Sequence, residues 1–525
     1  MDARAGFYTP VKCDENRPSC SRCSKNRQAC EYPHKFDLIL RNQNDRAEKA
    51  VKKKWRQRAT RTTFSPSLPN INGIRSTVSQ QTVPSSNFST IPQLVSLRPS
   101  LQQLVHSRFI FDFATARNRD TTSGGALDRI PQLMAASPPD SWLYSAISAL
   151  SFANFGNRLN SQDAKYIGAA LYNTALGRFA KTISSCGDGK IKTEEALFGI
   201  FLLGIYEAIT STDFDGIYAT HQRGAISILE YSWDGGNGRD RFGKSYHASI
   251  LYMQALMYCL TNIESPPSFL ADIELYSKSD PRSELTTLMY NACKLRYKFS
   301  QHCTLFRDKD LNEKQWRSYR LLWEVMDLDK ALEEWYQRIT SCGGQTFSRT
   351  CTVNVQNRPQ WARELFNLPG APKEMIIYDT FLTALSTNHY RGTRLLLNLS
   401  ILEWAHSTAH SSLSDAKTLL YNESIIFSTA ALLMELITDL CMSVPFMLQL
   451  TAAGGMNDPQ STEELYSLRG MLMLWPLVAA IACLQNKDVQ NCDVDFKRGW
   501  LQHVFVFLRN SLGLGKAQAF LSKYN

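Results

Sequence analysis

From about residue 101 to the end of the chain, apolar residues recur with the spacing of α-helices. Behind a Thr193-Glu194-Glu195 start, apolar positions follow i, i+3, i+4, i+7 and i+8, which places them on one helix face. Those positions are Leu197, Ile200, Phe201, Gly204 and Ile205. The same period recurs within 328–339 and 432–437, whereas no series of alternating β-branched strands is found. The pattern predicts that residues 101–525 form an all-α, multi-helix domain.

The pattern stops before that region. Residues 63–100 are rich in Ser, Thr, Pro, Asn and Gln, carry few charges, and show no helical period. Such a composition predicts a flexible, disordered linker. The longest nearly unbroken apolar run, 470–484, is too short to span a bilayer and contains Pro476, so we expect a buried core helix and no membrane segment. No signal peptide is visible, which favours an intracellular protein.

Positive charge is concentrated at the start of the chain. The formal net charge is +10, and residues 1–62 alone hold 16 Lys+Arg against 7 Asp+Glu. A basic head of this kind is what attraction to nucleic-acid phosphates requires, although a solvated basic tail would look the same. Within the basic segment 36–62, the densest run predicts a nuclear import signal, phosphate contacts, or both. That run contains Lys52, Lys53, Lys54, Arg56 and Arg58.

Four cysteines in residues 1–35 have the spacing of metal ligands. Cys13, Cys20, Cys23 and Cys30 form the pattern C-x6-C-x2-C-x6-C. Two thiolates three residues apart can bind one tetrahedral zinc ion, and two further cysteines flank this pair symmetrically. The segments between them hold almost no apolar residue, so this head needs a metal to fold. The pattern predicts a small zinc-binding N-terminal module.

The cysteine segment resembles the last two-thirds of the fungal Zn(II)2Cys6 binuclear zinc cluster, a DNA-binding module. The four cysteines match its third to sixth ligands, Lys12 and Asp14 flank Cys13 as is usual there, and Pro18 falls in its proline-bearing loop. The resemblance implies zinc as cofactor, double-stranded DNA as partner and the nucleus as location. It also implies a sequence-specific regulator of RNA polymerase II genes that works as a homodimer or heterodimer. Control of one biosynthetic gene cluster would be an ordinary role for this family.

The resemblance also assigns DNA contacts. Lys12 corresponds to the end of the family's basic helix and is the candidate nearest the base edges. The remaining basic residues are expected to contact mainly phosphate. They are Arg17, Arg22, Lys25 and Arg27.

The chain departs from the family pattern immediately before Cys13. The family has a further Cys-x-x-Cys pair and a basic helix there, but this chain has MDARAGFYTP. Six thiolates hold two zinc ions in the family, whereas four can close one site. One hypothesis is that the start belongs to a different first exon or transcript. The alternative is a regulator without autonomous DNA binding, which acts through dimerisation or co-regulator contact by its helical domain.

The helical region carries a second resemblance, to the fungal-specific transcription factor domain. Three groups of residues carry it, in the order expected of that family. They are 203–207 followed by 221–225, then 388–391 with 394–397, and finally 474–477. The resemblance implies an all-helical regulatory domain used in dimerisation, effector sensing or contact with co-regulators.

We expect no enzyme, because the chain has no G-x-S-x-G, no H-E-x-x-H and no dinucleotide fingerprint. His221 is predicted to be a hydrogen-bonded packing residue, and Glu207 to pair with Arg223 or His221 in a structural polar cluster. The segment 187–190 is expected to be a turn. The aromatic stripe is expected to line the core or a groove, and the nine later cysteines to be buried, reduced thiols. The stripe consists of Trp316, Tyr319 and Trp323.

Overall fold

The computed structural model describes most of the chain after residue 99. The described ranges are 100–114, 127–185, 193–212, 219–234, 246–273, 275–276, 280–304, 311–341, 348–356, 358–409, 416–450, 465–489 and 493–524. The predicted zinc module, the basic segment and the predicted linker up to residue 99 lie outside these ranges.

Helices dominate the part of the chain that the structure describes. It is 80% helix and contains fifteen α-helices, which confirms the all-α prediction for this region. In chain order these are α3 (Leu101–Phe109), α4 (Ile130–Ala136), α5 (Trp142–Arg158), α6 (Gln162–Ser185), α7 (Thr193–Thr210), α8 (Ala219–Asp234), α10 (Tyr246–Asn262), α11 (Pro281–Thr304), α12 (Leu311–Ser341), α13 (Gln360–Phe366), α14 (Phe381–Ala409), α15 (Ala416–Met447), α16 (Ser467–Leu484), α17 (Val494–Asn510) and α18 (Lys516–Tyr524). A π-helix, Ile110–Ala114, continues α3, and a short 3-10 helix covers Ser268–Asp272.

Local sequence determines where the first helices begin. The Ser100 hydroxyl accepts a hydrogen bond from the backbone N–H of Gln103, and the Gln103 side chain accepts one from the backbone N–H of Ser100. This capping box satisfies two amides at the start of α3. Ser141 caps α5 in a similar way by accepting from the Tyr144 amide. α5 and α6 then pack closely, because Gly168 has no side chain to separate their backbones.

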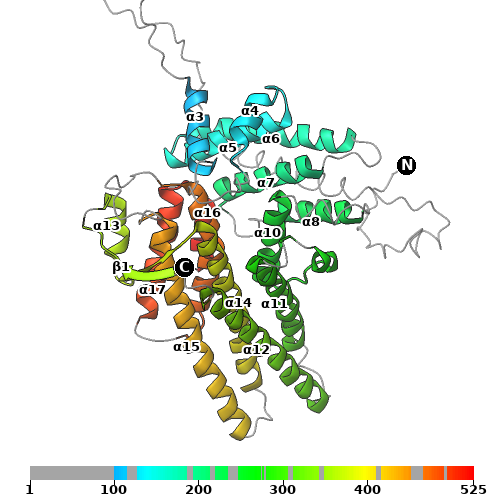
Figure 1. The fold of residues 1–525 in the computed structure, drawn as a ribbon, viewed down its shortest axis with the longest axis vertical. Coiled ribbons are helices and arrows are strands. Elements are labelled where there is room, and N and C mark those ends of the chain that lie inside the picture. Colours follow the sequence, from blue (N-terminus) through cyan, green and yellow to red (C-terminus); the bar gives the residue numbers. More distant parts are fainter. Residues whose placement is uncertain are drawn as a thin grey trace, which may run out of the picture. The chain divides into compact units, whose positions relative to one another are not determined.

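α14 is the central helix of the unit. It contacts α11, α12, α15 and α16 and therefore loses nearly all of its surface between residues 388 and 402. Figure 1 shows α14 running alongside α12 and α15. Four consecutive turns without an exposed side chain show that this helix is buried on every face, so its polar residues need partners within the protein.

One small sheet interrupts the helices. β1 (Ser348–Thr352) and β2 (Glu374–Tyr378) pair antiparallel, with Thr350 opposite Ile376. β2 packs on α15 and buries Met375, Ile376 and Tyr378. The sequence pattern did not predict this strand pair, since five-residue strands are too short to show a convincing alternation.

Among the residues that the structure describes, two helices are long and apolar enough to cross a membrane by length and composition alone. In α16, 83% of the apolar window is buried inside the protein, which confirms the predicted core helix around 470–484. In α15 only 39% of the apolar segment within Leu419–Met447 is buried. The two helices therefore have similar hydropathy but very different surroundings.

Candidate functional site

The predicted zinc ligands lie outside the described residues, as do the basic residues predicted to contact DNA and the run at 52–58. Their donor chemistry can still be compared with the cofactor. Four thiolates complete one tetrahedral zinc site, whereas a binuclear cluster shares six thiolates between two ions. The donors present from Cys13 to Cys30 therefore fit one zinc ion and are two short of a two-zinc cluster.

The described helices offer no second metal centre. Among the residues that the structure describes, no group of three or more His, Cys, Asp or Glu could hold a metal ion. Cys259, Cys293, Cys441 and Cys483 are free and buried, and Cys351 is partly buried, as expected of reduced thiols. Burial raises the pKa of Cys259, Cys441 and Cys483 to about 12, which keeps these thiols protonated and unreactive at neutral pH.

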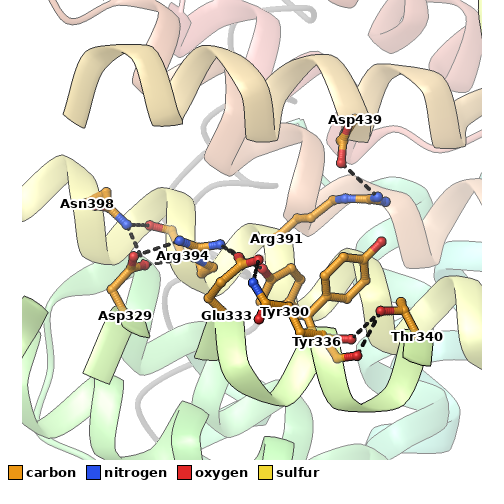
Figure 2. Close-up of polar contacts among 10 residues, drawn as sticks. Asp329, Glu333, Tyr336, Thr340, Tyr390, Arg391, Arg394, Asn398 and Asp439 are labelled. Carbon is orange, nitrogen blue, oxygen red and sulfur yellow. Dashed lines mark hydrogen bonds and ion pairs between the residues drawn. The ribbon is translucent and has the colours of Figure 1, made fainter. Parts of the chain in front are cut away.

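The most elaborate polar site in the helical unit is an arginine cluster on α14 (Figure 2). Arg394 donates two parallel hydrogen bonds to Asp329 of α12, at 2.8 and 2.7 Å. It also pairs with Glu333, one turn further along α12, and donates to the Tyr390 hydroxyl at 2.7 Å. Asn398 donates to Asp329 at 2.7 Å. Because Arg394 is almost completely buried, these partners compensate the cost of removing its charge from water.

Arg391 connects the same stretch of α14 to two other elements. Its guanidinium donates to the Tyr378 hydroxyl of β2 at 2.6 Å and lies 3.2 Å from the Asp439 carboxylate of α15. The Arg391 side chain is 1% exposed, whereas Asp439 is 39% exposed. Figure 2 shows that Arg391 and Arg394 lie one turn apart and point to different neighbours. Together they link α12, α14, α15 and β2.

Electrostatics follow from this geometry. Burial alone would lower the pKa of Arg394, but its hydrogen bonds and attraction to Asp329 outweigh burial and raise it. Burial likewise works against Glu333, yet the Tyr390 hydrogen bond and the Arg394 charge hold the Glu333 pKa below its ordinary value. These pKa shifts keep Arg394 and Glu333 charged at neutral pH, which suits a structural role and not proton transfer.

Two of the sequence motifs meet at a second contact on α14. Trp475 of α16 packs so closely on Gly392 that an added Cβ would lie 2.5 Å from the indole ring. The indole N–H donates to the Thr261 hydroxyl at 2.9 Å, and the His389 ring lies edge-on to the indole. Burial lowers the pKa of His389 to about 4, so this imidazole is neutral at pH 7. Residues 388–391 and 474–477 thus belong to one packed core.

The predicted cluster around His221 is present. His221 Nε2 lies 2.8 Å from the Tyr172 hydroxyl and 3.2 Å from Glu207 Oε1, joining α6, α7 and α8. Tyr172 stacks on Tyr206 with ring centroids 4.0 Å apart. Burial, followed by the nearby Glu207 charge, raises the pKa of Tyr172 well above its ordinary value. The partner of Glu207 is therefore His221, whereas Arg223 hydrogen-bonds to Tyr258.

The remaining predictions have mixed outcomes. Tyr319 packs edge-on against Trp404 with ring centroids 5.2 Å apart, as expected of core lining. Trp323 is 56% exposed, so the core assignment is wrong for this residue. The side chain of Trp316 and the segment 187–190 lie outside what the structure describes. Sequence reasoning missed the arginine cluster, although Arg391 and Arg394 lie directly before the apolar run Leu395–Leu397, where a buried arginine needs acidic partners.

Comparison with known proteins bears on the head of the chain. A search of curated proteins and a search of solved structures found no match. Residues 10–38 match the family model of the fungal Zn(2)-Cys(6) binuclear cluster domain. This family binds zinc and DNA, is typically non-enzymatic and acts in the nucleus. Residues 10–38 are thus similar to a zinc-binding Zn(2)-Cys(6) domain, and such a domain implies a fungal DNA-binding transcription factor.

Proposed function

We propose that this chain is a sequence-specific regulator of RNA polymerase II genes, with control of one biosynthetic gene cluster as its role. The observation that carries the proposal is the family match at residues 10–38, placed ahead of a large helical unit. In the proposed organisation, residues 1–35 bind DNA, 36–62 supply phosphate contacts or nuclear import, 63–100 connect, and 101–525 regulate. The polar clusters around Arg394 and His221 in the helical unit are structural and paired.

The DNA-binding head is proposed to hold one zinc ion through Cys13, Cys20, Cys23 and Cys30. When bound, the ion supplies a tetrahedral crosslink that orders a segment with too few apolar residues to fold alone. Lys12 would then lie nearest the edges of the DNA bases, while the other basic residues of the module contact phosphate. Those bases are Arg17, Arg22, Lys25 and Arg27.

A second function is favoured by one specific observation, the absence of a Cys-x-x-Cys pair before Cys13. With four of the six family ligands, the head would not reproduce the two-metal cluster. In this alternative the chain has no autonomous DNA binding and acts through its helical unit. That unit would pair with an intact relative or bind a co-regulator.

Metal analysis combined with DNA binding separates these functions. We expect purified full-length protein to carry one zinc ion per chain and to bind a promoter fragment in a gel-shift assay. A chelator should abolish binding, and Cys20→Ser should lose both zinc and binding. Cys441→Ser, a matched change of a buried thiol in the helical unit, should retain both. Protein that holds no zinc, or binding that ignores the chelator, would refute the zinc-organised head and leave the second function.

A further inference from the structure

An apolar surface spans the start of α15 and the neighbouring part of α12. Phe427 is 80% exposed and Leu420 is 65% exposed. These two residues are seven positions apart, on the outer face of α15. Tyr319 of α12 contacts Tyr421 of α15, with ring centroids 6.5 Å apart, and therefore brings the two helices together here. Trp323 comes four residues after Tyr319, and Met326 comes seven residues after it. Both therefore lie on the side of α12 that faces Tyr421. We name this surface the α12–α15 patch; its exposed members are Trp323, Met326, Leu419, Leu420, Tyr421 and Phe427.

The outer face of α15 has a regular pattern of side-chain sizes. Large residues recur every seven positions at Leu420, Phe427 and Met434. Small residues recur between them with the same period, at Ser424, Ala431 and Thr438. Alternating steps of four and three residues define a heptad seam, the spacing with which one helix packs along another. The opposite face of α15, which includes Ile425, Leu433 and Leu436, is buried in the helical unit, so the seam faces outward.

We infer that the α12–α15 patch is the surface through which two copies of this chain pair. The inference rests on the dimer expected of a regulator with the proposed function, and it names the interface. In an antiparallel pair with its two-fold axis level with residue 429, each large residue meets a small one. Phe427 lies opposite Ala431 of the second copy, Leu420 opposite Thr438, and Met434 opposite Ser424. The seam is thus complementary to itself, which an isologous two-fold interface requires.

The exposed area is sufficient for a dimer. From the exposed fractions of its six members, the patch offers roughly 500 Å² of apolar surface per copy. Two copies would bury about 1,000 Å² before any polar area is counted, which reaches the lower bound of specific interfaces. The seam from Leu420 to Thr438 is about 27 Å long, so it can accommodate several turns of the partner helix. Antiparallel pairing also sets opposite ends of the two helix dipoles beside each other.

A size-swap experiment on full-length protein tests the interface. We expect sedimentation velocity to show a dimer for the wild type. Phe427→Ala should weaken dimerisation about 30-fold or more, as loss of a central aromatic anchor does. Ala431→Phe should weaken it as well, since two phenylalanines would then collide. The double variant F427A/A431F should restore the dimerisation constant to within about threefold, because each large residue again meets a small one.

Phe496→Ala is the matched control, since Phe496 is 56% exposed on α17, away from the patch, and its loss should leave dimerisation unchanged. A monomeric wild type, a dimer insensitive to Phe427→Ala, or no rescue by the double variant would overturn the interface. The interface would also be overturned if the wild type did not self-associate but bound phosphatidylcholine vesicles, while the F427A variant did not bind them. That result would identify a membrane surface. Zinc content and DNA binding, measured on the same samples, report separately on the proposed function. Loss of those in a protein that still dimerises would refute the zinc head and not the patch.

Discussion

Replacing Arg394 by alanine should destabilise the helical unit more than most single changes. The substitution removes both hydrogen bonds to Asp329 and the pairing with Glu333. In the native cluster the Asp329 side chain is only 12% exposed, and Asn398 would be its remaining partner there. The variant therefore leaves a buried carboxylate largely uncompensated and also opens a cavity in the packing of α14 against α12.

The magnitude follows from these surroundings. Breaking a buried ion pair by removing one partner typically costs about 3–5 kcal/mol, because the remaining charge keeps its desolvation penalty. We expect the lower half of that range, since Asn398 still donates to Asp329 and Glu333 can be hydrated. Replacing both Arg394 and Asp329 by methionine and leucine should cost much less, because no charge is then left buried.

Equilibrium urea denaturation followed by far-UV circular dichroism measures these effects. Arg338→Ala is the matched control, because Arg338 pairs with Glu284 on the surface, where both side chains are about half exposed. Exposed pairs contribute at most about 1 kcal/mol. The reasoning would be refuted if Arg394→Ala cost no more than Arg338→Ala, or if the methionine–leucine double variant were as unstable as Arg394→Ala.

Three further predictions concern packing, pH and charge. Gly392→Ala should lower the free energy of unfolding by about 1–3 kcal/mol, because the added methyl group overpacks against Trp475. Gly204→Ala should stabilise α7 slightly, because its Cβ meets nothing within 4 Å. Urea titrations compare the two variants. The pKa of His389 is about 4 in the folded protein and 6.5 in the unfolded chain, so the unfolded state binds the proton first as the pH falls. The free energy of unfolding should therefore drop by up to about 3 kcal/mol between pH 6.5 and 4. His389→Gln should flatten that loss in denaturation curves taken across this pH range. If the lysines and arginines within 52–58 contact phosphate, replacing them by glutamine should reduce the slope of the logarithm of the DNA-binding constant against the logarithm of the salt concentration. An unchanged slope together with lost nuclear accumulation would assign these residues to import alone.

Helical periodicity was enough to predict the class of the fold. The regular apolar spacing around Leu197 and Leu328 lies on α7 and α12, and the run at 470–484 became the buried helix α16. The β1–β2 pair could not be predicted, because Glu374–Tyr378 is stabilised by packing on α15, a helix far along the chain. Local patterns carry no information about such distant partners.

The candidate sites were predictable to different degrees. Cysteine spacing is local chemistry, so the zinc-binding character of residues 10–38 was clear from the sequence and is confirmed by the family match. Pairing of Glu207 with His221 was predicted only as one of two choices, because residues fourteen apart on separate helices can meet in several ways. The arginine cluster was missed because Asp329 and Asp439, the partners of Arg394 and Arg391, lie on two other helices and reach α14 only when the helices pack.

Burial, and not hydropathy, distinguishes α15 from α16, the two apolar helices. Windows in α15 and α16 have mean hydropathy 1.8 and 1.7, yet their buried shares are 39% and 83%. Composition cannot distinguish them, because both would be stable in a core or against a partner. The arrangement of sizes does differ: α15 repeats Leu420, Phe427 and Met434 at intervals of seven on a face that the rest of the unit leaves open. Since exposed apolar surface of this extent indicates an interaction site, this face of α15 is where we expect the helical unit to meet its partner.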